Sequence, residues 1–338
     1  MKQTGRLDSQ AAVAPRDQPA TGKVLTAPAA PAATATLPVV RGERPARRSR
    51  WPAPLVLLRP RQWVKNVFVL IVPLAVAPAA LLRHLAPALT TAAAFTAASS
   101  AVYVFNDWID RDQDRLHPTK RHRPLASGEV GPLGALALGV GCLATACAAG
   151  GLLPKGVQAA VAGYAVLNLA YCLALKRYPL VDVTTVSVGF VLRAVAGCLA
   201  VAAPFDPILI MCVYCTCLLM SLGKRRHELA TASRPGQAMA RRPALTGYSL
   251  ALLDQLTAVL LAATLISYEL FVLFAPYPHA AVLAVVTMPF SVFALCRYTQ
   301  LVSLHRSGGE PGRDVLTDPQ LAVNALLWLA CLAVGRLV

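Results

Sequence analysis

Residues 106–114 read Asn106-Asp107-Trp108-Ile109-Asp110-Arg111-Asp112-Gln113-Asp114 and follow directly on an apolar segment at about 86–105. If a helix continues through this stretch, Asp107, Asp110 and Asp114 lie at positions i, i+3 and i+7 and share one face, whereas Asp112 points elsewhere. Four of the 16 acidic residues of the chain fall within 107–114. Hard divalent ions such as Mg²⁺ take one or two carboxylates together with phosphate oxygens. The stretch therefore predicts a catalytic Mg²⁺ site formed by Asp107, Asp110 and Asp114.

A solvated loop is the alternative interpretation of the same stretch. Its carboxylates would then pair with the basic residues nearby, which are Arg111, Arg115, Lys120, Arg121 and Arg123. The spacing alone does not separate the two interpretations. The position at the end of an apolar helix, followed by His117-Pro118-Thr119-Lys120 and Arg123-Pro124, favours a functional site.

The composition of the whole chain indicates a membrane protein. Of its 338 residues, 56% are hydrophobic and 14% are charged, and the mean hydropathy is +0.55; soluble domains are about 25% charged. A bilayer helix needs about 20 mostly apolar residues. We therefore expect an all-α protein with nine transmembrane helices, at about 64–82, 86–105, 132–153, 157–175, 181–203, 206–222, 249–274, 278–297 and 318–337.

The distribution of lysine and arginine predicts the orientation of these spans. The N-terminal region through Lys65 and the loops 106–130, 176–180, 223–248 and 297–317 hold 28 of the 32 basic residues. The connections on the other side are short and basic-poor. Because cytoplasmic loops carry the excess of lysine and arginine, we expect a multi-pass protein of the inner (plasma) membrane whose active site faces the cytoplasm.

Residues 1–50 differ in composition from the rest and divide the chain into two regions. They are rich in Ala, Pro, Thr and Arg and have no aromatic residue. We interpret them as a disordered basic tail that precedes a catalytic domain at 51–338. The net charge of +16 suits an anionic membrane surface, so no nucleic-acid partner is needed to explain it. The Cys212–Cys215 pair lies in an apolar run and is interpreted as helix packing rather than as a metal or redox site.

The acidic stretch 106–114 and the residues that follow it resemble a known family. Asn106-Asp107-x-x-Asp110-x-x-x-Asp114 is similar to the first Asp-rich motif of the UbiA-type membrane prenyltransferase superfamily, and the following His-Pro-x-Lys-x-x-Arg-Pro stretch is similar as well. The resemblance covers roughly residues 55–338. It implies an all-helical nine-span fold and a Mg²⁺-dependent transfer from a pyrophosphate-bearing donor.

Two further stretches resemble a divergent branch of this superfamily. Typical members carry a second Asp-rich motif after the sixth span, where this chain has Gly223-Lys224-Arg225-Arg226-His227-Glu228-Leu229. That stretch, together with Leu58-Arg59-Pro60-Arg61-Gln62-Trp63-Val64-Lys65-Asn66, resembles the decaprenyl-phosphate phosphoribosyltransferases. The resemblance implies transfer of 5-phosphoribose from phosphoribosyl pyrophosphate to a polyprenyl phosphate, with pyrophosphate released.

The charge of the substrates supports the same branch. Phosphoribosyl pyrophosphate carries a 5-phosphate in addition to its pyrophosphate, and the lipid acceptor adds a third anionic site. Lysine and arginine in place of a second carboxylate set supply partners for these phosphates. The resemblance, which also includes the stretch 171–176 and Asp182 with Arg193, implies a wider set of substrate-binding residues: Lys65, Asn66, Asn106, Lys120, Arg123, Lys176, Asp182, Arg193, Lys224, Arg225 and Glu228.

Each of these assignments has a structural alternative. The basic residues after a span can be topology signals, Lys65 can be an interfacial anchor, and Glu228 can pair with Lys224 at i+4. Arg193 lies inside a span, where an arginine is expensive and usually faces the protein interior; helix packing is its other interpretation. Asp182 lies three turns away on the same helix face.

The lipid phosphate is already an anion at neutral pH, so the expected displacement at the ribose needs no general base. The polyprenyl tail is expected in a lipid-facing groove between spans. Two other functions stay open: transfer of a prenyl group from a prenyl diphosphate to an aromatic or other small acceptor, and a transporter, for which internal repeats or polar groups at mid-membrane would be expected. A homo-oligomer is also left open.

Overall fold

The computed structural model describes residues 51–117, 120–231, 242–276, 279–304 and 317–337. Every regular element in these ranges is a helix, which confirms the all-α class. The interpretation of residues 1–50 as a disordered tail falls outside the described residues and stays a prediction. The account below concerns the compact unit Ala46–Val338.

The fold is built from long helices joined by short ones. The long helices are α4 (Leu85–Ile109), α7 (Pro132–Gly151), α8 (Lys155–Leu173), α9 (Val181–Ala200), α10 (Pro207–Ala230), α12 (Leu250–Leu273), α13 (Ala280–Leu304) and α15 (Pro319–Leu337). The short helices are α1 (Ala53–Leu57), η1 (Pro60–Val67), α2 (Phe68–Val76), α3 (Pro78–Arg83), α5 (Arg111–Leu116), η2 (Lys120–His122), α6 (Pro124–Ser127), η3 (Leu175–Arg177) and η4 (Pro243–Gly247).

Seven helices of the described ranges are long and apolar enough to cross a membrane: α4, α7, α8, α9, α10, α12 and α13. An eighth apolar stretch, Pro319–Gly335 in α15, is shorter. The expected first span, 64–82, is not one continuous helix, because η1, α2 and α3 divide it. The count of nine transmembrane helices is therefore not confirmed.

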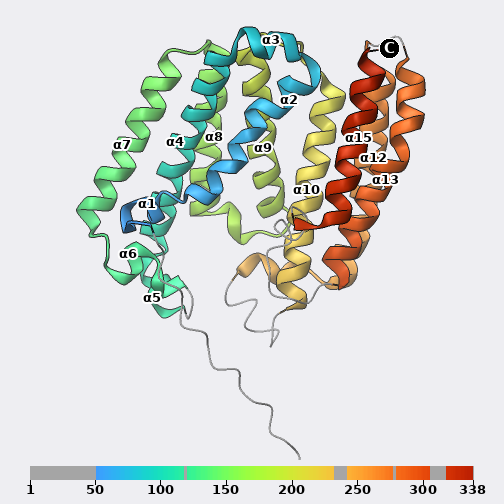
Figure 1. The fold of residues 1–338 in the computed structure, drawn as a ribbon. Coiled ribbons are helices and arrows are strands. Elements are labelled where there is room, and N and C mark those ends of the chain that lie inside the picture. Colours follow the sequence, from blue (N-terminus) through green and yellow to red (C-terminus); the bar gives the residue numbers. More distant parts are fainter. Residues whose placement is uncertain (1–50, 118–119, 232–241, 277–278, 305–316, 338) are drawn as a thin grey trace, which may run out of the picture. The chain divides into compact units, whose positions relative to one another are not determined.

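Proline explains the break in the first predicted span. Pro73 lies inside α2, and Pro78 begins α3. Steric contact with a proline ring pushes the preceding residue out of the helical region, and Ala77 accordingly has φ −147° and ψ 62°. The segment is apolar, as expected, but its prolines divide the expected span into an oblique series of short helices, η1, α2 and α3 (Figure 1).

The core of the unit lies around α4 and α9. In each of these two helices about 56% of the most apolar 18-residue stretch is buried. The corresponding share is 17% in α7, which lies at the edge of the bundle. Small residues permit the closest approaches, as is usual between membrane helices. At Gly197 in α9, an added Cβ would lie 1.9 Å from the carbonyl oxygen of Val69 in α2. The two backbones are therefore in direct contact there.

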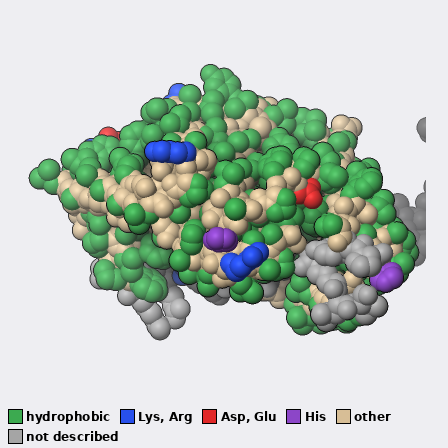
Figure 2. Space-filling model, turned by 90° about the horizontal axis from the view of Figure 1, so that it is seen from above, with side chains coloured by type: hydrophobic (Ala, Val, Ile, Leu, Met, Phe, Trp, Pro, Cys, Tyr) green, Lys and Arg blue, Asp and Glu red, His purple; other side chains and the backbone are tan. Residues whose placement is uncertain are grey.

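Charged connections gather at one end of the helices. In Figure 1 the end of α4, with α5 and α6, and the end of α10 predicted to be cytoplasmic lie at the bottom, whereas α3 and the end of α15 lie at the top. Figure 2 looks down on the top end, where hydrophobic side chains cover most of the surface and charged side chains are few. This asymmetry places the predicted site residues of α4, α5 and α10 at one end.

Candidate functional site

The three aspartates of the first motif lie at the junction of α4 and α5. Asp107 is in the last turn of α4, Asp110 follows its final residue, and Asp114 is in α5. The expected single helix is interrupted at Asp110, whose φ and ψ are −83° and −1°. The backbone N–H groups of Asp110 and Asp114 nevertheless each donate to the carbonyl four residues earlier. The i, i+3, i+7 stripe is therefore kept across the junction.

Arginines hold two of these carboxylates together. A single nitrogen of Arg123, Nη1, donates to Asp107 at 3.0 Å and to Asp114 at 2.7 Å. Arg59 pairs with Asp107 from the other side, and Lys120 lies 3.7 Å from Asp114. Both carboxylates are only 3% exposed, so the cations compensate charges that water does not reach.

Asp110 has a partner of its own in the α8–α9 connection. The Lys176 Nζ in η3 donates to both carboxylate oxygens of Asp110, at 2.9 and 3.0 Å, and reaches Asn106 Oδ1 at 3.4 Å. Asp112, by contrast, is 76% exposed and pairs with Arg111 and Arg115 beside it. The structure thus brings Asn106, Asp107, Asp110 and Asp114 together with three predicted cations, and it excludes Asp112.

The chemistry of this cluster fits a divalent ion. Within the described ranges no three His, Cys, Asp or Glu side chains form a metal-holding group on their own. Instead, Arg123 bridges Asp107 and Asp114, and Lys176 pairs with Asp110. The oxygen set of Asp107, Asp110 and Asp114 is one that Mg²⁺ accepts, and the cations in contact with it are suited to phosphate oxygens.

A second charged cluster lies between α9, α10 and the segment after residue 241. Asp182, whose side chain is 0% exposed, has its Oδ2 atom 3.4 Å from Arg225 Nε and 3.9 Å from Arg242 Nε. Glu228 pairs with Arg225 at i−3 and with Arg242 at 3.3 Å. Arg242 also donates to the hydroxyl of Tyr171 at 2.8 Å. Three predicted residues, Asp182, Arg225 and Glu228, are therefore together here.

Tyr248 fixes Asp182 in this second cluster. Its hydroxyl donates to Asp182 Oδ1 at 3.0 Å and accepts from the Leu180 N–H at 2.6 Å. Burial raises the pKa of the Tyr248 hydroxyl, so it stays a donor. Leu180 has φ +62°, a left-handed conformation that is costly for a branched residue. The hydrogen bond to Tyr248 compensates this strain at the start of α9.

Arg193 and Asn66 form a separate network inside the bundle. Arg193 donates to Asn66 Oδ1 at 2.8 Å, to Gly189 O at 2.9 Å and to Tyr164 Oη at 2.8 Å. Its guanidinium lies 4.4 Å from the centroid of the Tyr164 ring. Asn66 in turn donates to Thr96 at 2.9 Å. These partners join η1, α4, α8 and α9, and the substrate-binding role of Asn66 and Arg193 stays a prediction.

Two further predicted residues are exposed, and three residues of the clusters were not predicted from the sequence. Lys65 in η1 and Lys224 in α10 are exposed. Sequence reasoning missed three residues that contact the clusters: Arg59 as a partner of Asp107, and Arg242 and Tyr248 as partners of Asp182. Arg59 offered one signal, since it lies in the Leu58–Asn66 stretch that resembles the family branch.

Residues 66–311 match the model of the UbiA prenyltransferase family. Decaprenyl-phosphate phosphoribosyltransferase of Mycobacterium tuberculosis is 34% identical over 277 residues, which cover 81% of this chain and 90% of that protein. The protein of the same name from Corynebacterium glutamicum is 35% identical over 286 residues, covering 82% and 85%. The chain therefore belongs to the UbiA prenyltransferase family, as its motifs predicted.

A solved structure shows the same fold. The UbiA homolog from Archaeoglobus fulgidus bound to GPP and Mg²⁺ superimposes with a TM-score of 0.64 at 18% identity, covering 85% of this chain and 100% of that one. With its apolar helices and this family membership, the chain is a multi-pass membrane protein.

Proposed function

We propose that the chain transfers 5-phosphoribose from phosphoribosyl pyrophosphate to a polyprenyl phosphate such as decaprenyl phosphate, releasing pyrophosphate, as part of lipid-linked sugar synthesis for the cell envelope. The relatives at 34% and 35% identity that carry this activity in their names support it over more than four fifths of the chain. The transfer depends on Mg²⁺, the ion present in the solved family member.

The observation that carries this proposal is the pairing of two charged clusters of different composition. The first holds Asp107, Asp110 and Asp114 with cations between them. The second holds Arg225 and Arg242 around Asp182. They approach each other through the α8–η3 segment, because Tyr171 contacts Arg242 and Lys176 contacts Asp110. A donor with a phosphate at each end matches two such clusters better than a prenyl diphosphate, which has one charged end.

Each cluster has a defined role in the reaction. Asp107, Asp110 and Asp114 would hold Mg²⁺, which supplies charge stabilisation for the departing pyrophosphate. Arg123, Lys120 and Lys176 orient the pyrophosphate oxygens, and Arg225 with Lys224 receives the 5-phosphate. The bond from the anomeric carbon to pyrophosphate breaks as a lipid phosphate oxygen bonds to the opposite face of the ribose. The lipid phosphate is anionic, so no proton has to be removed.

The orientation belongs to the same proposal. The clusters lie at the end of the helices whose loops carry most of the lysine and arginine, and such loops face the cytoplasm. Phosphoribosyl pyrophosphate is a water-soluble anion, so a cytoplasmic site in the inner (plasma) membrane gives it direct access. The acceptor arrives from the bilayer.

A donor comparison tests the function. Membranes that contain the protein are incubated with Mg²⁺, polyprenyl phosphate and phosphoribosyl pyrophosphate labelled in the ribose, and the organic phase is counted. Parallel tubes receive a labelled prenyl diphosphate with an aromatic acceptor. We expect label in the lipid only with the phosphoribosyl donor, and none with an Asp114→Asn variant. Lipid label from the prenyl donor alone would replace this function by aromatic prenyl transfer.

A further inference from the structure

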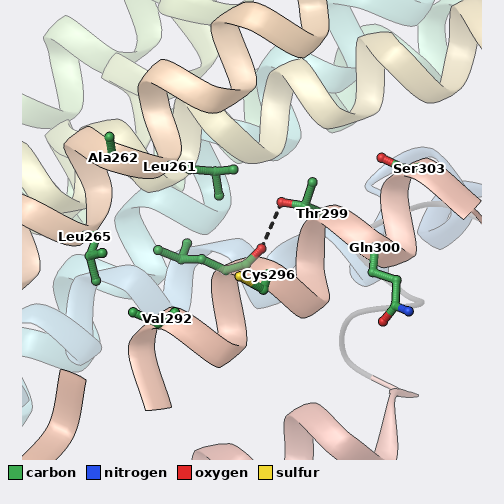
Figure 3. Close-up of a pocket in the computed structure, with 9 residues that line it drawn as sticks. Leu261, Ala262, Leu265, Val292, Cys296, Thr299, Gln300 and Ser303 are labelled. Carbon is green, nitrogen blue, oxygen red and sulfur yellow. Dashed lines mark hydrogen bonds between the residues drawn. The ribbon is translucent and has the colours of Figure 1, made fainter. Parts of the chain in front are cut away.

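An apolar groove runs between α12 and α13, away from both charged clusters. Its volume is about 470 Å³, within the range of small-molecule sites. In Figure 3, Leu261, Ala262 and Leu265 come from one helix and Val292 and Cys296 from the other. Val292 is 37% exposed, so the groove opens to the outside of the bundle. In a membrane protein that side faces lipid.

The groove continues into a smaller and more polar hollow. This hollow has a volume of about 210 Å³ and shares Leu261, Thr299 and Ser303 with the groove. Its other walls include Arg226, Asp254 and Thr257. Arg226 lies in the last two turns of α10 and Asp254 near the start of α12. The polar hollow therefore lies at the end of the helices that carries the charged clusters, and the apolar groove extends from it along α12 and α13.

Thr257 gives an independent sign of a ligand in the hollow. The residue is 8% exposed, and its hydroxyl has no hydrogen-bond partner within the part of the chain that the structure describes. A buried hydroxyl without a partner costs free energy and is uncommon in folded proteins. Thr257 lines the hollow, so a rotation of its side chain would let an oxygen of a bound molecule supply the missing partner.

Arg226 supplies the charge at the same place. Its Nε and Nη2 atoms donate to Asp254, and its Nη1 atom reaches the carbonyl oxygen of Val302 at 3.5 Å. The Arg226 side chain is 17% exposed, whereas Asp254 is 52% exposed. Asp254 can therefore turn to water at little cost, which frees the guanidinium for an anion. The neighbouring Arg225 points to Asp182 instead, on a different face of α10.

We propose that the hollow and the groove together form a binding site for the polyisoprenyl phosphate acceptor, with its phosphate at Arg226 and Thr257 and its chain between α12 and α13. The inference rests on the proposed function for the identity of the lipid. One small anionic end joined to one narrow apolar channel matches a single-chain lipid monophosphate. The hollow lies at the same end of the helices as the donor clusters, and Arg226 directly follows Arg225 of the second cluster in α10.

Photo-crosslinking of the full-length protein in nanodiscs tests this site. The probe is a polyisoprenyl phosphate with a photoreactive group on its chain, and labelled peptides are identified by mass spectrometry. We expect label on α12 and α13 that unlabelled polyprenyl phosphate removes and that polyprenol or phosphatidylglycerol leaves in place. Arg226→Ala should reduce labelling about tenfold, the range of a lost charge-assisted hydrogen bond. Asp254→Asn should increase it, because a competing carboxylate is removed.

Matched variants separate a lipid site from a structural role. Ala262→Trp fills the groove and should abolish the label, whereas Val259→Trp, on the same helix but outside the groove and 66% exposed, should not. Reduced labelling in Asp254→Asn would show that the ion pair is structural and overturn the inference. Transfer by wild-type protein without label on α12 or α13 would overturn this site alone. Absence of transfer by wild-type protein would overturn the proposed function and, with it, the acceptor named here.

Discussion

Burial separates the four aspartates of the first motif into two kinds. Asp107 and Asp114 are almost fully buried between arginines, and Asp110 is held by Lys176, whereas Asp112 is 76% exposed. Each of the three that Asp112 is set against has a lysine or arginine within ion-pair distance of its carboxylate.

Asparagine substitutions test this division. Asp110→Asn and Asp114→Asn should each reduce transfer at least about a hundredfold, as expected when a charge that stabilises the transition state is lost. Membrane insertion should be unaffected, because shape and volume are kept. Asp112→Asn is the matched control and should keep most activity. Initial rates of lipid labelling at fixed protein give the comparison, and an Asp112 variant as damaged as Asp110→Asn would contradict the assignment.

The partners of these aspartates explain why residue-level prediction was incomplete. The spacing of Asp107, Asp110 and Asp114 is local, so the sequence was sufficient to place them on one stripe. Arg59 is 48 positions from Asp107, and Lys176 is 66 positions from Asp110. Such pairs depend on how the helices pack. Lys176 was selected only through the family resemblance, and Arg242 carried no local signal.

Among the elements, the contact of α2 with α9 depends on a single small residue. An alanine at 197 would place its Cβ 1.9 Å from the Val69 carbonyl oxygen, which is backbone and cannot rotate away. Gly163 in α8 has nothing within 4 Å of the corresponding position. The two glycines therefore lie in helices of the same bundle but differ in the space beside them.

Alanine at the two positions should have opposite effects on stability. Gly163→Ala gains about 1 kcal/mol of helix propensity and should raise the melting temperature in detergent. Gly197→Ala should lower it, because α2 and α9 must separate. Thermal unfolding followed by tryptophan fluorescence measures both. Equal melting temperatures for Gly197→Ala and wild type would show that the α2–α9 contact is looser than described.

At the same scale, hydropathy predicted most elements; of the nine expected spans, 64–82 is divided and 318–337 holds a shorter apolar stretch. Seven of the expected spans correspond to long apolar helices. The segment 64–82 has the right hydropathy but contains Pro73 and Pro78, so its backbone cannot form one straight helix. Hydropathy indicates the environment of a segment, whereas the continuity of a helix depends on its backbone. A prediction from hydropathy alone therefore does not detect a break at proline.

For the whole molecule, the concentration of charge at one end has a consequence that membrane vesicles can test. Phosphoribosyl pyrophosphate does not cross a sealed bilayer. Inverted vesicles expose the cytoplasmic face and should transfer label to lipid, whereas sealed right-side-out vesicles should do so only after detergent is added. Activity in the opposite set of vesicles would contradict the orientation drawn from the lysine and arginine distribution.

The central claim is that the two charged clusters hold the two ends of one donor. Arg225 is the residue to change, because it lies in the second cluster and belongs to the stretch that differs from typical family members. A lost charge-assisted phosphate contact is worth roughly 1.5–3 kcal/mol, about ten- to two-hundredfold in a rate or binding constant.

The decisive measurement compares the kcat/KM of wild type and Arg225→Ala for phosphoribosyl pyrophosphate and for an analogue that lacks the 5-phosphate. The account predicts that the variant loses at least about tenfold with the intact donor and little with the analogue, which has already lost the contact. Equal losses with both donors would show that Arg225 supports the fold rather than the 5-phosphate, and would contradict the claim.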